Sequence, residues 1–422
     1  MTTKSTDEAA DASPSPESPS YPQLLRRNPR LAALLASYVV SSVGDGIVLI
    51  ALPLLAIRHH GALSAPVAVS LTMTAPYVLT TVIALGVGLG RLRLPIRGVV
   101  ITDSALRTAL FTVVGLAALV EWIDIWVMVA ALMLGSVLHL PASSARRLVA
   151  TGMADKEELY AVNGLLGFAN SVALYVVGPA LGGAVTVVFG AGIACLFEAA
   201  SFLVLLGVVS LVVPPQPGAA RKERASRSGW HILRLHPMAA RLFAVVFLFN
   251  LSYMPVEVAL PLLAKEDLHG DGNTLGFIWT AFGAGALIGG ALTNRLRRLP
   301  QQAVLVSVIA LWGASVVILG LATSLPVAAC AFALGGLVYA PFTPIAYTFV
   351  QSALRPEEQQ PVITLWTTGS TLAAPVGLPL SGPVVGALDA RGGLLLSAGL
   401  TLALVPLAAR GLLGARQDVS EG

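Results

Sequence analysis

Apolar residues gather along the chain into twelve long runs separated by short polar segments. A run of roughly 20 apolar residues is long enough to cross a bilayer as one α-helix. The alternation of polar and apolar residues that is typical of a membrane β-barrel does not occur. The pattern therefore predicts an all-α membrane protein with twelve transmembrane helices, at residues 31–57, 66–89, 97–120, 123–145, 160–188, 190–213, 241–264, 274–294, 302–322, 325–349, 361–388 and 391–414.

The first and seventh runs share a sequence, which indicates an internal repeat. ALPLLA occurs at residues 51–56 and again at 259–264, 208 residues later. We predict two pseudo-symmetric six-helix halves, residues 31–213 and 241–414. The polar, Pro-rich and basic residues 214–240 read as a cytoplasmic linker. The Ser- and Pro-rich residues 1–30 are expected to be a disordered cytoplasmic tail, and residues 415–422 a second cytoplasmic tail.

Charged residues are few, and their positions predict how the protein is oriented in the membrane. Charged residues make up 11% of the chain, against about 25% in soluble domains, and the mean hydropathy is +0.80. Most of the 26 lysines and arginines lie in the tails and in alternate loops, whereas only Arg58, Lys265 and Arg391 fall on the opposite side. The positive-inside rule puts both termini in the cytoplasm of a multi-pass plasma (inner) membrane protein. Basic residues scattered over short loops argue against nucleic-acid binding.

Enzymatic chemistry finds little support in the sequence. Cys195 and Cys330 lie inside apolar runs, where packing is favoured over a disulfide, a metal site or a nucleophile. No run carries clustered His, Cys or acidic residues at ligand spacing, and no G-x-x-x-x-G-K-[ST] loop occurs. We predict that the protein is not an enzyme, uses no metal or cofactor, and is not driven directly by ATP.

Three acidic residues within the apolar runs are the candidates for proton coupling: Asp45, Glu198 and Glu257. A charge at the centre of a membrane helix costs roughly 2.5 to 3.5 kcal/mol, so acids there usually have a function. Desolvation favours the neutral form of a carboxylic acid, which lets it load and release a proton, and the charged form attracts a cationic substrate. The alternative is that Asp45, flanked by Gly44 and Gly46, accepts hydrogen bonds from a neighbouring helix.

Asp103 and Arg107 lie one helical turn apart in the third run. At this spacing we expect them to neutralise each other as a structural ion pair near the cytoplasmic end of the helix. Glu198 lies at a similar depth to Arg107, so a contact between these two is also conceivable.

Two glycine-led, arginine-rich turns resemble the signature of the major facilitator superfamily. The first carries Gly86 and Arg91, with Arg97 nearby, and the second carries Gly290, Arg295 and Arg298; the acid of the family pattern is replaced by Gly90 and Asn294. GPALGG, whose matching residues are Gly178, Pro179, Gly182 and Gly183, resembles the tail of the family's antiporter motif. GDGIVLIALPLLA and TDSALR look most like the macrolide-efflux and siderophore-exporter branch.

This resemblance implies a major facilitator fold in which the halves rock about a central substrate site. The signature and antiporter residues, with Asp103 and Arg107, would then serve conformational change. In such a fold the first, fourth, seventh and tenth helices line the cavity. The substrate-wall candidates on these helices are His139, Asn250, Tyr253, Tyr339, Thr343 and Tyr347. The last three follow i, i+4, i+8 spacing and are predicted to share one helix face, which could equally be a packing face.

The sequence thus predicts a secondary active transporter that exports a drug-like or secondary-metabolite molecule in exchange for protons. Its expected partners are a small-molecule substrate, protons and the lipid bilayer, and it is expected to act as a monomer. Two alternatives stay open: an importer or facilitator of a small metabolite, and a membrane sensor that transports nothing.

Overall fold

The structure of this chain, a computed structural model, describes residues 21–88, 92, 94–155, 157–214, 229–296, 298–352 and 354–413. Every regular element in these ranges is a helix. The tail predicted at 415–422, and parts of the predicted tail 1–30 and linker 214–240, lie outside the described residues.

The N-terminal half crosses the membrane six times. The crossings are made by α2, by α3, by α4, by α5 with α6, by the run α7–η1–α8, and by α9. The bounds in this half are α1 (Tyr21–Arg27), α2 (Pro29–Arg58), α3 (Ala65–Gly88), α4 (Ile96–Leu119), α5 (Ile125–Gly135), α6 (His139–Gly152), α7 (Leu159–Val172), the π-helix η1 (Ala173–Val177), α8 (Gly178–Phe189) and α9 (Ala191–Val212).

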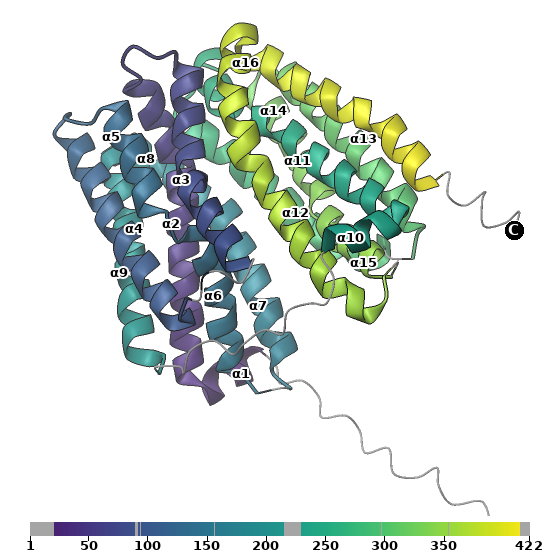
Figure 1. Cartoon of the computed structure of the whole chain (residues 1–422). Helices are drawn as coiled ribbons and strands as arrows, with labels where there is room; N and C mark the ends of the chain where they lie inside the picture. Colours follow the sequence, from purple (N-terminus) through teal and green to yellow (C-terminus); the bar gives the residue numbers. More distant parts are fainter. Residues whose placement is uncertain are drawn as a thin grey trace, which may run out of the picture.

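The C-terminal half repeats this order. Its elements are α10 (Gly229–Leu235), α11 (Pro237–Leu262), the π-helix η2 (Leu263–Asp267), α12 (Gly272–Leu296), α13 (Gln301–Gly320), α14 (Leu325–Tyr339), α15 (Phe342–Ser352) and α16 (Pro356–Leu413). α16 turns back on itself at Asp389, where the backbone (φ 61°, ψ −178°) leaves the helical region, and so supplies the last two crossings. Figure 1 shows its two arms meeting in a sharp bend.

Eleven helical segments of the described chain are long and apolar enough to span a membrane, and the last of these, Gly369–Arg410, contains the turn at Asp389. The predicted all-α fold with twelve membrane crossings is therefore confirmed. The protein is a multi-pass integral membrane protein.

Proline explains two interruptions of these helices. The tenth crossing breaks at Ala340 and Pro341, between α14 and α15, because proline has no N–H to donate and its ring crowds the preceding turn. The fifth crossing widens into the π-helix η1 immediately before Gly178 and Pro179.

Two short helices lie where the sequence predicted none; α1 contradicts the expected disorder of residues 21–27, whereas the assignment of residues 214–240 as a linker stays a prediction. α1 occupies part of the segment expected to be a disordered tail, and its Leu24 is fully buried against the first half. α10 occupies part of the expected linker, and Ile232 and Leu233 are buried in the main core. In both segments the apolar residues are few, but they meet a partner surface that the local sequence does not reveal.

The two halves lie side by side (Figure 1) and meet through α3 with α16 and through α8 with α12. The Ser70 hydroxyl donates to the Leu378 carbonyl at 2.7 Å. Gly183 approaches the backbone of Gly272 so closely that a Cβ at residue 183 would lie 2.7 Å from the Gly272 carbonyl oxygen. These contacts are near the loops that precede α3 and α12 and follow α8, at the end of the bundle opposite the termini.

Candidate functional site

A buried arginine joins three helices at the centre of the N-terminal half. Arg107 of α4 donates to the Asp45 carboxylate of α2 at 2.8 Å and lies 3.5 Å from the Glu198 carboxylate of α9. The Glu198 side chain is fully buried, that of Arg107 is 7% exposed and that of Asp45 is 22% exposed. The contact between Glu198 and Arg107 that their similar depth allowed is therefore present, and Asp45 is the most exposed of the three residues.

Close helix packing holds Glu198 beside Asp45. The Ser201 hydroxyl donates to Glu198 Oε2 at 2.9 Å. A Cβ at Gly44 would overlap both Glu198 Oε2 and Ser201 Oγ, so only glycine lets α2 approach α9 at this point. Two acids therefore share one guanidinium.

A second buried ion pair extends this network towards the termini. Asp103 of α4, fully buried, accepts from Arg146 of α6 at 3.0 Å. The predicted ion pair between Asp103 and Arg107 was wrong, because each of them finds a partner on another helix. Pairing across helices satisfies both charges, whereas a contact along α4 would leave Asp45 and Glu198 without a cation.

Both guanidinium groups of the network lie over the ring of Phe202. The Arg107 Cζ lies 4.2 Å from its centroid and the Arg146 Cζ lies 5.2 Å from it. Such cation–π contacts are stronger when desolvated, as here. Three buried polar atoms of the network have no hydrogen-bond partner among the described residues: Asp103 Oδ1, Arg107 Nε and Arg146 Nε. The network is thus well packed but incompletely satisfied.

His139, predicted as a cavity residue, belongs to this network. Its Nδ1 lies 3.2 Å from Arg107 Nη1. An arginine can only donate, so His139 must accept at Nδ1, which fixes it as the neutral tautomer in this arrangement. The Tyr77 ring packs edge-on against it, 6.4 Å between centroids.

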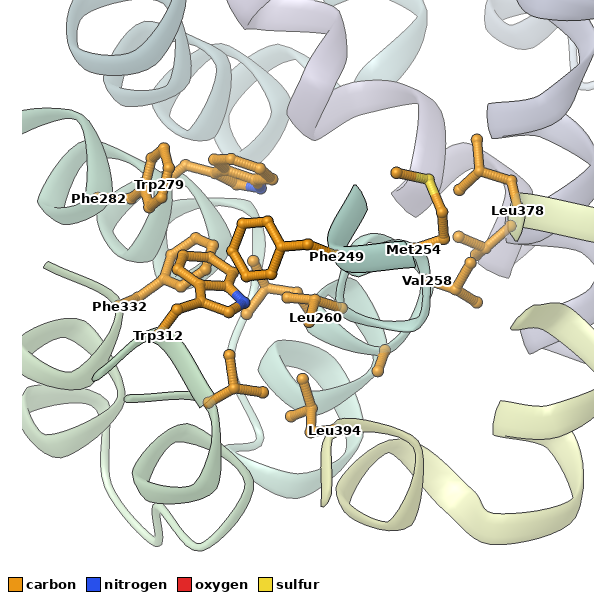
Figure 2. Close-up of a cluster of buried hydrophobic side chains, with 14 of the residues drawn as sticks. Phe249, Met254, Val258, Leu260, Trp279, Phe282, Trp312, Phe332, Leu378 and Leu394 are labelled. Carbon is orange, nitrogen blue, oxygen red and sulfur yellow. The ribbon is translucent and has the colours of Figure 1, made fainter. Parts of the chain in front are cut away.

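The C-terminal half places one acid beside a large aromatic cluster. The Tyr253 hydroxyl donates to Glu257 Oε1 at 2.6 Å on α11. The Tyr253 ring packs against Trp312 of α13 at 5.5 Å and stacks on Tyr339 of α14 at 6.4 Å. Figure 2 shows Phe249, Trp279, Phe282, Trp312 and Phe332 gathered at the heart of this half. Glu257 is partly exposed at the edge of this cluster.

The break at Pro341 divides the predicted substrate wall. Tyr339 lies on α14, whereas Thr343 and Tyr347 lie on α15, so the three residues do not share one uninterrupted helix. Thr343 is exposed, and Tyr347 packs against Trp366 of α16 at 5.8 Å. Asn250 donates to the Val246 carbonyl of its own helix at 2.8 Å. Of the six candidates, Tyr253 and Tyr339 belong to the aromatic cluster, and His139 contacts Arg107 of the buried network.

Tyr175 extends the aromatic cluster of the C-terminal half into the N-terminal half. Its ring stacks on Trp279 of α12 at 6.2 Å and packs edge-on against Phe282 of the same helix at 5.9 Å. The aromatic cluster is therefore completed by a residue of the opposite half.

The glycines of GPALGG form helix contacts. A Cβ at Gly178 would lie 2.6 Å from the Gly46 Cα, and one at Gly182 would lie 2.8 Å from the Ile47 carbonyl oxygen. Pro179 meets Gly276 and Gly183 meets Gly272, both on α12. α8 is thus clamped between α2 of its own half and α12 of the other.

The two arginine-rich turns say less about function than the buried network does. Arg97 donates to the Val213 carbonyl at 2.8 Å and to the Ser210 carbonyl at 2.9 Å, and so caps the end of α9. Gly86 packs against Leu92, whereas nothing would obstruct a Cβ at Gly290. Arg295 and Arg298 are exposed, and Arg91 lies outside the described residues.

Several site residues were missed from sequence. Arg146 was counted only as a positive charge near a helix end, and Ser201, Phe202, Tyr77 and Tyr175 were not singled out. Ser201 and Phe202 follow Glu198 by three and four residues, which is the spacing of helix neighbours and could have revealed them. Within the part of the chain that is described, no three His, Cys, Asp or Glu side chains gather as a metal site would require.

Comparison with known proteins gives one family. Residues 34–354 and 242–420 match the model of the Major Facilitator Superfamily. The multidrug efflux pump Tap of Mycolicibacterium fortuitum is 25% identical over 382 residues, covering 86% of this chain and 90% of the pump. Macrolide efflux protein A of Streptococcus pyogenes is 24% identical over 273 residues, 61% of this chain and 66% of that protein.

Solved transporters share the fold. A bacterial homologue of the human lysosomal transporter Spinster, solved in an inward-facing and unoccupied conformation, superposes with a TM-score of 0.70 at 13% identity, covering 92% of this chain and 97% of its own. The POT family transporter PepTSo gives a TM-score of 0.71 at 10% identity, covering 92% and 98%.

Proposed function

This chain belongs to the Major Facilitator Superfamily, and from that premise we propose that it exports lipophilic, cationic, drug-like molecules across the plasma membrane in exchange for protons, by alternating access. The observation that carries the proposal is the cluster in which Arg107 holds Asp45 and Glu198 together. The N-terminal half would bind the proton, and the C-terminal half would bind the substrate.

Charge counting supports the proton site. The buried network holds three carboxylates, those of Asp45, Asp103 and Glu198, and two guanidiniums, those of Arg107 and Arg146. Fully ionised, it would carry one uncompensated negative charge in a region of low dielectric, which is costly. One bound proton removes that charge. Asp45 and Glu198 surround the same guanidinium, so they are the pair that would share it.

Partial exposure supports Asp45 as the residue that exchanges the proton. Its side chain is 22% exposed, whereas that of Glu198 is fully buried. A proton would enter through Asp45 and be held between the two acids. When Arg107 pairs fully with Asp45, as at 2.8 Å here, the proton is best released.

The aromatic cluster supports a cationic, apolar substrate. Glu257 supplies a negative charge, and Tyr253, Tyr339 and Trp312 supply flat ring surfaces next to it. Aromatic faces and a carboxylate together attract organic cations. No comparable aromatic cluster accompanies the acids among the described residues of the first half.

Export is supported by the relatives, two of which are a multidrug efflux pump and a macrolide efflux protein. Alternating access is supported by the contacts between halves, which lie at the end of the bundle opposite the termini. With both termini in the cytoplasm, this arrangement is closed to the outside.

The test is drug export from cells that express the full chain. Wild type should extrude lipophilic cations and macrolide-like compounds, and Asp45→Asn should lose export at unchanged expression. Glu121→Gln is the matched control, because Glu121 is 72% exposed and pairs only with the exposed Arg58. Unchanged export by Asp45→Asn would reduce Asp45 to a packing role. Absence of export by wild type would favour an importer or a sensor.

A further inference from the structure

A hollow of about 340 Å³ opens between α11 and α16 at the end of the C-terminal half that carries the chain terminus. It is lined by Arg241, Ala244 and Val245 of α11 and by Leu407 and Arg410 of α16. Arg241 lies in the second turn of α11 and Arg410 in the last turn of α16. The two arginines therefore lie beside the apolar residues Ala244, Val245 and Leu407 at the same end of the helix bundle.

Neither arginine is neutralised by another described residue. Among the described residues, no carboxylate or carbonyl pairs with Arg241 or Arg410, and both side chains are exposed. The other arginines that line helix contacts in this protein are paired, as Arg146 with Asp103 and Arg391 with Asp267. Two guanidinium groups at one hollow, without a partner among the described residues, are suited to bind an anion.

The surroundings of the hollow are those of a membrane interface. α10, which precedes α11 by a single residue, carries Trp230, which is 49% exposed, and Arg234 lies over its ring at 5.3 Å. Exposed tryptophan at a helix end marks the headgroup level of a bilayer. From Leu407 an exposed apolar stripe continues up α16 through Leu400 and Leu396, which are 46% and 36% exposed. A ligand here would have an anionic head and an apolar tail.

We propose that Arg241 and Arg410 form a site for the phosphate headgroup of an anionic phospholipid in the cytoplasmic leaflet, whose acyl chain lies along Leu407, Leu400 and Leu396. Guanidiniums bind phosphate in a fixed, bidentate geometry, and basic recesses between membrane helices suit such headgroups. The site is separate from the buried acids and does not depend on what the protein transports.

Native mass spectrometry of the purified full-length chain in detergent tests the site. Phosphatidylglycerol and phosphatidylcholine with identical acyl chains are compared, because both carry a phosphate but only phosphatidylglycerol has a net negative charge. Wild type should retain phosphatidylglycerol with a preference of about tenfold or more, since hydrogen bonds to a charged group contribute on that scale. Arg241→Gln/Arg410→Gln should lose the preference, and Arg410→Lys should keep part of it.

The matched control is Arg26→Gln/Arg27→Gln, which removes the same charge from the exposed end of α1. It should bind phosphatidylglycerol as wild type does.

The proposal is overturned if Arg241→Gln/Arg410→Gln keeps the preference, or if the control loses it equally. Displacement of the lipid by millimolar inorganic phosphate alone would identify a free-phosphate site instead. If the double variant is not folded by size-exclusion chromatography, Arg410→Gln alone gives the same decision.

Discussion

Arg107 pairs with Asp45 on α2, two helices distant in the sequence, and leaves Asp103, one turn away on its own helix, to Arg146. This exchange of partners ties α2, α4, α6 and α9 into one polar unit inside an otherwise apolar half. Breaking it at different points should have distinguishable effects.

Loss of the central cation should be the most damaging change. Arg107→Gln leaves Asp45 and Glu198 as buried acids without a counter-charge, which should destabilise the protein by about 3 to 5 kcal/mol. Thermal unfolding of purified protein measures this loss. Asp45→Asn combined with Arg107→Gln should recover part of it, because one uncompensated charge is then removed. Wild-type stability of Arg107→Gln would contradict the role of Arg107.

The pairing of Asp103 can be measured by double-mutant cycles. Asp103→Asn with Arg146→Gln should give a coupling energy within the range of about 0.5 to 3 kcal/mol that residues in contact show. Asp103→Asn with Arg107→Gln should give a smaller one, because these residues are not paired directly. A larger coupling to Arg107 than to Arg146 would restore the ion pair along α4 that the spacing predicted.

Alanine substitutions at two glycines distinguish the effect of close helix packing from the effect of helix propensity. Gly44→Ala places a methyl group on Glu198 Oε2 and should displace that acid from Arg107, with loss of export. Gly207→Ala is the control, since nothing lies within 4 Å of its Cβ position and alanine should stabilise the helix by roughly 0.5 to 1 kcal/mol. Equal export by the two variants would argue against a functional role of the Glu198 position.

The contact between halves should tolerate little added volume. A Cβ at Gly283 would overlap the Tyr175 backbone, so Gly283→Val should keep α12 from closing on η1 and should abolish transport. Labelling of a cysteine introduced at Thr280, whose hydroxyl donates to the Val176 carbonyl at 3.2 Å, should become faster in this variant. The background should lack Cys330, which is exposed. Unchanged labelling would mean that the halves still close.

Substitutions at Tyr339 and Thr343 should show which of the predicted substrate-wall residues contribute to drug binding. Tyr339→Ala removes a ring that packs on Tyr253 and Trp312, and aromatic pairs contribute about 0.5 to 1.5 kcal/mol, so apparent drug affinity should fall up to about tenfold. Thr343→Ala should leave affinity unchanged, because Thr343 is exposed beyond the break at Pro341. Dose-response curves for efflux compare the two. A greater effect at Thr343 would favour the continuous face predicted from sequence.

Sequence patterns predict this fold well because membrane crossings are encoded locally. An apolar run of sufficient length has no alternative to a helix in lipid, and a charge within it is conspicuous. Asp45, Glu198 and Glu257 could therefore be selected from sequence. Their partners could not, because pairing depends on helix rotation and on close approaches such as Gly44 against Glu198. The division of the tenth crossing at Pro341 was also missed, because the proline is visible in the sequence but spacing alone does not show that the helix ends there.

The single-residue turn at Asp389 has a mechanical consequence. The Asp389 carboxylate accepts from the Gly392 N–H at 2.8 Å, so the second arm of α16 starts immediately, without intervening loop. The two arms therefore have no slack between them. The first arm contacts α3 of the opposite half through Gly382 and Ser70, and the second carries Arg410 at the far end. A tilt of the first arm therefore also moves the start of the second arm.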